Sequence, residues 1–254
     1  MKNQERWIPT KYVVRRGRLA GSRDERELAV ASRLTTDTLA RYFETHLPRF
    51  CRGRLADLGC GKAPLFGVYR SHVSETVCVD WDGTLHGEDF LDVACNLNEP
   101  LPFEDARFDT VILSDVLEHL PDPAHLWGEA FRLLAPGGRL IASVPFLYGI
   151  HEAPNDYFRF TEFALRRFAA RAGFEVVLLE AYGGAPEVLG DLLAKLLVRV
   201  PGLGSPLAAA LQGIAAFCLR GGPGRRLSLR TRETTPLGYF MVAQKAAGPV
   251  QPLI

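Results

Sequence analysis

Short apolar runs alternate with helical stretches between residues 53 and 182, and this alternation constrains the fold more than any other feature. The apolar runs are "GRLADLG", "ETVCVDW", "FDTVILSD", "RLIASVPF" and "EVVLLEAY". The helical stretches "HLWGEAFRLLAPGG" and "TEFALRRFAARAGF" have expected ends at Ala135 and Gly173. Strands connected through helices pair in parallel, so the pattern predicts an α/β fold with a doubly wound, mostly parallel sheet.

Both ends of the chain depart from this alternation. Residues 1–23 carry seven basic residues against the single acid Glu5, which predicts an irregular basic arm. A helical flank is expected from Asp24 to Leu47, ended by Pro48. The predicted units are the arm and flank (1–50), the core (51–184), an apolar helical insertion (185–232), and the last strand "LGYFMVAQK" with the tail (233–254).

Charge and cysteine usage narrow the class of protein. Thirty Lys and Arg against 29 Asp and Glu leave a net charge of +1, which gives no whole-protein attraction to nucleic acid. The five cysteines show no CxxC pair and no metal-ligand spacing, and no signal peptide is recognised. We therefore expect reduced thiols and a cytoplasmic protein, and we leave open a peripheral position at the inner membrane.

A glycine turn follows the first predicted core strand. In "RLADLGCGKAP", Gly59 and Gly61 let a ligand approach the backbone N–H groups. The carboxylate of Asp57 would repel a pyrophosphate but would attract a ligand that carries an ammonium group. The next strand ends in "VCVDWD", where Asp80 can accept both hydroxyls of a ribose and Trp81 can lie beside the adenine.

These segments, with "NEPLPFEDARFDTVILSDVLEHLPDP" and "AFRLLAPGGRLIASVPF", resemble the successive motifs of the class I S-adenosylmethionine-dependent methyltransferases, specifically the methyltransferase type 11 group. The resemblance implies a seven-stranded Rossmann-like sheet and S-adenosyl-L-methionine as cofactor. It places Asp92 near the adenine amino group, with Asn96 as the alternative. The expected cofactor-binding set is Asp57, Gly59, Cys60, Gly61, Asp80, Trp81, Asp92 and Ser114.

Acceptor-side residues should follow the later strands, because ligands lie beyond the carboxyl ends of strands in open α/β sheets. The candidate catalytic side chains are His151, which could take a proton from a hydroxyl, and His119, for which a structural or cofactor-side role is the alternative. The candidate substrate-binding residues are Asp156, Tyr157 and Arg159. In the alternative interpretation Asp156 and Arg159 form an ion pair, and Thr161 caps the following helix.

The segment "EVLGDLLAKLLVRV" predicts a helix that is apolar except for one charged stripe, formed by Glu187, Asp191, Lys195 and Arg199. Its surface could pack within the chain, form a homodimer, enclose an apolar acceptor, or contact lipid through 187–219. The arginines of "RGGPGRRLSLRTR" would suit lipid phosphates.

The sequence thus predicts an enzyme that transfers methyl from S-adenosylmethionine to a small-molecule acceptor, with O-methylation in bacterial secondary (natural product) or glycan metabolism as the leading hypothesis. The alternatives are a lipid-linked or quinone-like acceptor at a membrane surface, an NAD-dependent oxidoreductase, and a non-catalytic cofactor-binding partner protein. Pro64 stands where the oxidoreductase fingerprint needs its third glycine. No HExxH motif, cysteine cluster or carboxylate triplet appears, so no metal is expected.

Overall fold

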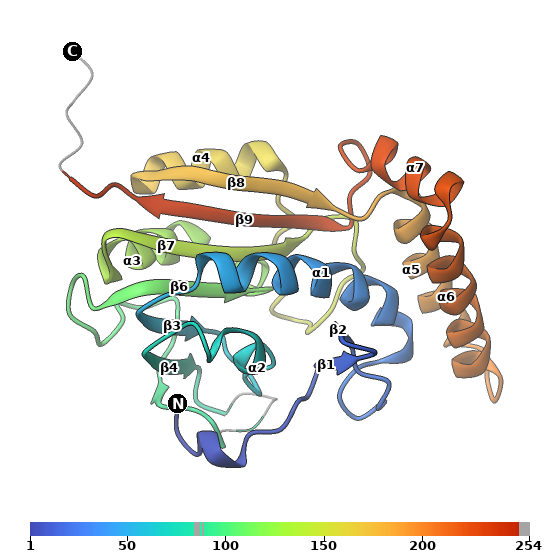
Figure 1. Cartoon of the computed structure of the whole chain (residues 1–254), viewed down its shortest axis with the longest axis horizontal. Coiled ribbons are helices and arrows are strands. Elements are labelled where there is room, and N and C mark those ends of the chain that lie inside the picture. Colours follow the sequence, from blue (N-terminus) through green and yellow to red (C-terminus); the bar gives the residue numbers. More distant parts are fainter. Residues whose placement is uncertain (84–86, 88, 249–254) are drawn as a thin grey trace.

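The computed structural model describes residues 1–83, 87 and 89–248. A seven-stranded sheet with the order β5-β4-β3-β6-β7-β9-β8 forms its centre (Figure 1). The first five strands in this order pair in parallel, and β9 runs antiparallel to both β7 and β8. This confirms the predicted doubly wound, mostly parallel sheet. The strands are β3 (Arg54–Leu58), β4 (Glu75–Asp80), β5 (Val93–Ala94), β6 (Phe108–Ser114), β7 (Leu134–Pro145), β8 (Phe174–Tyr182) and β9 (Gly238–Lys245).

Helices cover both faces of the sheet, because successive side chains of each buried strand point to opposite faces. In β6, Val111 joins one apolar cluster and its neighbour Ile112 joins the other. The Val111 cluster is completed by α3 (Pro123–Leu133) and α4 (Glu162–Ala172). The Ile112 cluster is completed by α1 (Arg33–Phe50) and α2 (Phe66–Tyr69).

The N-terminal segment is not the irregular arm that its charge predicts. It contains a short 3-10 helix, η1 (Gln4–Arg6), and a hairpin of β1 (Tyr12–Arg15) and β2 (Arg18–Gly21). The two connecting residues, Arg16 and Gly17, both have positive φ, as the tight turns that suit strand twist require. Tyr12 anchors the hairpin by packing edge-on against Phe43 of α1 at 5.4 Å between ring centroids. Packing of the buried Tyr12 ring thus gives this segment a regular structure despite its many basic residues.

Three predicted helix boundaries were wrong. The flanking helix begins at Arg33, after the 3-10 helix η2 (Val30–Ser32), and it continues past Pro48 to Phe50. Asp24 instead pairs with Arg26 in an exposed turn, with its Oδ2 2.6 Å from Nη2. The helix α3 ends at Leu133, two residues before Ala135, because the chain enters β7 directly. The end of α4 at Gly173, which has a φ of 94°, is confirmed.

Three helices lie between β8 and β9: α5 (Ala185–Leu197), α6 (Gly204–Arg220) and α7 (Gly222–Thr231). Figure 1 shows them at the end of the sheet toward which β3, β4 and β6 point. Buried hydrogen bonds attach them to the rest of the fold: the Gln212 side chain accepts from the Leu34 N–H at 2.8 Å and donates to the Ala31 carbonyl. Within residues 1–83, 87 and 89–248, no helix is long and apolar enough to span a bilayer.

Candidate functional site

The glycine turn connects β3 to α2 and needs glycine at its first position. Gly59 has a φ of 74°, and a Cβ there would lie 2.5 Å from Cγ2 of Val116, in the loop after β6. The Gly59 and Cys60 N–H groups donate to the Val79 carbonyl at 2.8 and 3.1 Å. The turn therefore lies at the carboxyl ends of β3, β4 and β6, where α/β sheets bind ligands.

Asp57 is buried under this turn at the end of β3. Its Oδ2 accepts a hydrogen bond from the buried Tyr69 hydroxyl at 2.9 Å. Burial raises the pKa of the Asp57 carboxyl to about 7, the Tyr69 hydroxyl acts in the opposite direction, and Asp80 adds to the rise. A cationic group bound beside Asp57 would favour the ionised carboxylate.

Asp80 ends β4 and is fixed by backbone donors on both carboxylate oxygens. The Gly61 N–H donates to Oδ2 at 2.8 Å, and the Trp81 N–H donates to Oδ1 at 2.9 Å. Each oxygen keeps a lone pair that a hydroxyl could use. The Trp81 ring is 48% exposed and thus open to a stacking partner.

The two candidates for the adenine contact occupy different ends of β5. Asp92 lies at its start, where Oδ2 accepts from the Cys78 N–H at 2.7 Å and lies 3.5 Å from the Met1 amino group. Asn96 follows the carboxyl end of β5, so the geometry favours Asn96 for a ligand at this edge.

Cys60 and Ser114 have protein partners at this edge. The Cys78 thiol and burial raise the pKa of the Cys60 thiol, which disfavours a nucleophilic thiolate. The Ser114 hydroxyl lies 3.4 Å from the Ser143 hydroxyl, which donates to Asp115 at 2.9 Å.

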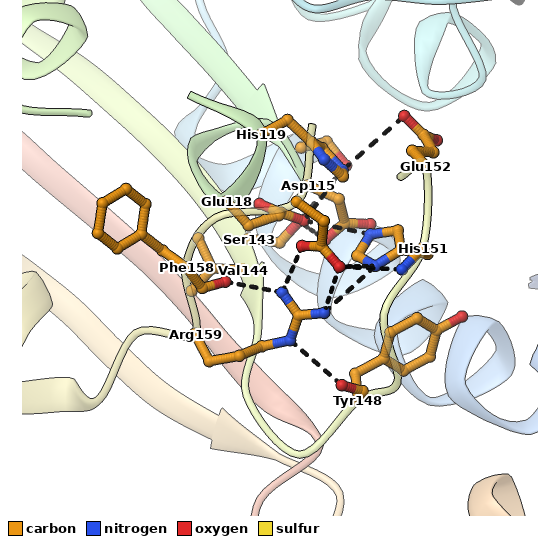
Figure 2. Close-up of polar contacts among 12 residues, drawn as sticks. Asp115, Glu118, His119, Ser143, Val144, Tyr148, His151, Glu152, Phe158 and Arg159 are labelled. Atoms are coloured by element: carbon orange, nitrogen blue, oxygen red, sulfur yellow. Dashed lines mark hydrogen bonds and ion pairs between the residues drawn. The ribbon is translucent and has the colours of Figure 1, made fainter. Parts of the chain in front are cut away.

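A second group of polar side chains lies beyond β6 and β7. Glu118 and His119 belong to the 3-10 helix η3 (Leu117–His119), and His151 belongs to the loop after β7. Figure 2 shows the three side chains turned toward one another. Nε2 of each histidine lies 3.8 Å from Oε1 of Glu118, and the imidazole centroids are 4.7 Å apart. We call this group the Glu118 cluster.

The histidines of the Glu118 cluster are oriented through their other ring nitrogens. Nδ1 of His119 lies 2.6 Å from the Asn155 carbonyl oxygen, to which it can only donate. Nδ1 of His151 lies 3.4 Å from Oδ2 of Asp156. Burial lowers the pKa of His151, and the neighbouring His119 lowers it further, so the ring is neutral near pH 7. Both Nε2 atoms are thereby directed at Glu118.

Asp156 and Arg159 form the ion pair of the alternative interpretation. The contacts are bidentate, at 2.6 Å between Nη1 and Oδ1 and 2.7 Å between Nη2 and Oδ2. Arg159 also donates to the carbonyls of Tyr148, Gly149 and Phe158 (Figure 2). These contacts fix the loop after β7. They also engage the Asp156 carboxylate and the Arg159 guanidinium with each other, as the alternative interpretation predicts.

The residues that follow in this loop have separate roles. Tyr157 remains 49% exposed, and its role as a substrate contact stays a prediction. Thr161 caps α4 as expected, accepting from the Ala164 N–H at 3.2 Å.

Several residues that border the Glu118 cluster were not predicted from the sequence to lie at the site. Asp115 has a φ of 55°, and its Oδ2 lies 3.4 Å from Nζ of Lys11, which precedes β1. The Tyr148 ring packs edge-on against His151 at 5.2 Å, and Nζ of Lys195 lies 3.1 Å from the Tyr148 centroid. Both the hairpin and α5 therefore border the cluster. Only the "SD" that ends β6 signalled such a neighbour in the sequence.

Comparison with known proteins matches the central part of the chain. Residues 56–142 match the family model described as a methyltransferase domain. A protein of Mycolicibacterium smegmatis described as a probable S-adenosylmethionine-dependent methyltransferase is 30% identical over 139 residues, covering 50% of this chain and 54% of that protein. The ubiquinone biosynthesis O-methyltransferase of Psychrobacter arcticus is 27% identical over 121 residues, 41% of this chain and 43% of that one.

The chain spans about half the length of the curated relatives it matches. A solved S-adenosylmethionine-dependent methyltransferase from Archaeoglobus fulgidus has a TM-score of 0.52 at 19% identity. The alignment covers 89% of this chain and 95% of that one, and the likeness concerns the fold.

Proposed function

We propose that this chain, a class I S-adenosylmethionine-dependent methyltransferase, methylates a hydroxyl group of a small-molecule acceptor. The observation that carries the proposal is the partly buried His151 beside Glu118, at the same sheet edge as the glycine turn. The oxidoreductase alternative is disfavoured, because Asp57 opposes a pyrophosphate and Pro64 replaces the third glycine.

The residues around the glycine turn suit the cofactor. S-adenosylmethionine, when bound, supplies a methyl group activated by its sulfonium charge. The buried Asp57 carboxylate, with a single hydroxyl donor on Oδ2, matches the ammonium of the aminocarboxypropyl group. Asp80 keeps lone pairs for the ribose hydroxyls. The absence of a side chain on Gly59 opens the approach to the turn.

The Glu118 cluster would act on the acceptor. A hydroxyl becomes a better nucleophile as it loses its proton, and a neutral imidazole can take that proton. Nδ1 of His151 lies against Asp156, which would stabilise the resulting imidazolium as it forms. His119, whose Nδ1 faces a carbonyl, presents Nε2 to the same space.

Methyl transfer to a panel of acceptors tests this function. The protein is incubated with methyl-labelled S-adenosylmethionine and with phenols, catechols, sugars or primary amines, and labelled products are separated by chromatography. We expect label on a hydroxyl-bearing acceptor, and turnover at least about 100-fold lower for His151→Asn but unchanged for His72→Asn on the exposed surface. Transfer to amines alone would contradict O-methylation.

A second candidate is an apolar, membrane-borne acceptor, and exposed side chains of α5 and α6 favour it. Leu189, Leu196, Ile214 and Phe217 are 59%, 61%, 62% and 73% exposed, respectively. Arginines of α7 lie next to this surface in the chain. Apolar residues beside arginines suit the boundary between lipid headgroups and acyl chains. The relative from Psychrobacter arcticus is named for ubiquinone biosynthesis, and its acceptor class is compatible with this surface.

Co-sedimentation with anionic phospholipid vesicles tests this candidate. We expect the wild type in the pellet and the Leu196→Glu/Phe217→Glu variant in the supernatant. Phe163→Glu is the matched control, because Phe163 is 74% exposed but belongs to α4. Recovery of the wild type in the supernatant would contradict lipid binding, and equal sedimentation of all three proteins would exclude this surface as its origin.

A further inference from the structure

The Glu118 cluster has the donor set of a metal site. One atom from each of Glu118, His119 and His151 lies within 4.8 Å of the other two. Two imidazole nitrogens and a carboxylate oxygen are ligands that divalent transition metals share. We propose that these three side chains bind a single divalent ion of this class, such as Zn²⁺ or Co²⁺.

Glu118 carries most of the argument. Its side chain is fully buried, and neither carboxylate oxygen has a hydrogen-bond partner in the part of the chain that the structure describes. A buried carboxylate without donors is costly, since desolvation is not offset. A cation between Glu118 and the histidines would remove this cost.

The histidines are already oriented as ligands. Metal-binding imidazoles usually donate their second N–H to a carbonyl or a carboxylate, which fixes the ring and directs the other nitrogen at the ion. His119 has a carbonyl at this position, at 2.6 Å, and His151 has the Asp156 carboxylate at 3.4 Å. The bidentate contact with Arg159 fixes Asp156 in turn. The support expected around a metal site is therefore present.

Two of the three separations between ligand atoms require only a small contraction, and all three atoms lie within 4.8 Å of one another. Ligand atoms around a tetrahedral zinc ion lie ~3.3 Å apart, given bonds of ~2.0 Å. The separations of 3.8 Å from each histidine Nε2 to Oε1 of Glu118 exceed this by about half an ångström. Rotation of the exposed ends of the imidazoles, which are 17% and 26% accessible, can close the gap.

The ligand types of the cluster, two imidazoles and one carboxylate, also favour some ions over others. Mg²⁺, Ca²⁺ and Mn²⁺ favour oxygen ligands, whereas imidazole nitrogens suit zinc, iron and the later transition metals. Three protein ligands leave at least one coordination position open. If the proposed hydroxyl acceptor occupied that position, the ion would lower the pKa of the hydroxyl. The ion would then replace His151 as the group that activates the acceptor, because the Nε2 lone pair of His151 would be bound to the metal. This consequence rests on the proposed function, but metal binding itself does not.

Cobalt titration tests the site directly. The full-length protein is treated with EDTA, dialysed, and titrated with Co²⁺ while its visible ligand-field absorption is followed. We expect one equivalent of Co²⁺ to bind, and Zn²⁺ to displace it. The affinity should fall at least about 100-fold in Glu118→Gln and in His151→Asn, and remain unchanged in the control His72→Asn.

Thermal unfolding supplies a second measurement that is independent of methyl transfer. An ion that binds the native state raises Tm by mass action, so Zn²⁺ should raise the Tm of the wild type and of His72→Asn but not that of Glu118→Gln. Glu118→Gln should fold normally, because it keeps the size and shape of the side chain. Failure of the wild type to bind Co²⁺, or an unchanged affinity in Glu118→Gln, would overturn the proposal. Metal binding without O-methylation would refute the proposed function alone.

Discussion

The glycine turn and the Glu118 cluster lie at the same edge of the sheet, but their buried acidic side chains differ in the hydrogen bonds that they accept. At the turn, Asp80 accepts backbone N–H groups on both oxygens, and Asp57 accepts the Tyr69 hydroxyl. In the cluster, Glu118 is fully buried and accepts no hydrogen bond from the residues that the structure describes. The first region is preorganised by the protein itself, whereas the second has an electrostatic requirement that an added cation would meet.

This difference indicates how each region depends on its ligand. The turn keeps its geometry through the fold, so a bound cofactor should change it little. The cluster should be more stable with a cation than without one. Five predictions, taken in order of expected effect, would break or sharpen this contrast.

Removing Arg159 should have the largest effect, because it leaves the buried Asp156 carboxylate without its bidentate partner. We expect Arg159→Ala to lower the free energy of unfolding by about 3–5 kcal/mol, measured by urea denaturation. Arg166→Ala on α4, which breaks an exposed contact to Glu162 at 3.8 Å, should cost at most about 0.5 kcal/mol. Equal costs would show that the loop after β7 does not depend on this pair.

The contact between Asp156 and Arg159 should also make the free energy of unfolding depend on pH. The Arg159 hydrogen bonds lower the pKa of Asp156 to about 2, so the stabilisation is present above the unfolded pKa near 3.8 and is lost as the pH falls toward 2. The difference in unfolding free energy between wild type and Arg159→Ala should therefore narrow below about pH 4. A difference that stays constant down to about pH 2 would contradict this assignment.

Asp57→Asn should reduce cofactor affinity by about 100-fold, because it removes the buried charge that faces the ammonium group. Calorimetric titration with S-adenosylhomocysteine measures the change. Glu104→Gln, an exposed acid in the loop before β6, is the control and should bind as the wild type does. If Asp57→Asn bound the cofactor with wild-type affinity, the ammonium group would not lie beside Asp57.

Cofactor affinity should also depend on pH through Asp57. Its pKa of about 7 in the free protein falls when a cation binds, so binding releases a proton at lower pH. We expect affinity to weaken by up to about tenfold per pH unit below about pH 7 and to level off above it. The same titrations in buffers of different ionisation enthalpy would count the released protons. A flat profile would show that Asp57 is already ionised.

Trp81→Ala should have the smallest effect, since the ring is half exposed and only its stacking contribution is lost. An affinity reduced by about fivefold corresponds to ~1 kcal/mol of aromatic contact. Phe163→Ala on α4 is the matched control and should leave affinity unchanged. A loss as large as that expected for Asp57→Asn would mean that Trp81 also supports the turn.

The sequence predicted what depends on neighbouring residues. The sheet, the turn at Gly59, the acid at Asp80, the Thr161 cap and the end of α4 at Gly173 all follow from short local patterns. The β1–β2 hairpin was missed because its strands are short and arginine-rich, and its anchor, Tyr12, contacts a residue of α1. The Asp156 and Arg159 pair could be stated only as an alternative, because a sequence does not show which groups an arginine already contacts.

The Glu118 cluster is the part of the site that the sequence could least predict. Glu118 and His119 come from one loop and His151 from another, and no metal-ligand spacing connects them in the sequence. Their approach depends on the pairing of β6 with β7 and on the Arg159 contacts that fix the second loop. The lack of a donor for Glu118 is a property of the packed structure, so composition and periodicity could not reveal it.

The most direct test of the account is calorimetric titration of S-adenosylhomocysteine, with NAD as a comparison, into metal-free and Co²⁺-loaded wild-type protein. The account predicts binding of S-adenosylhomocysteine in both forms with similar affinity, because the turn is built without the cation, and no binding of NAD. Failure of S-adenosylhomocysteine to bind either form, or preferential binding of NAD, would contradict it.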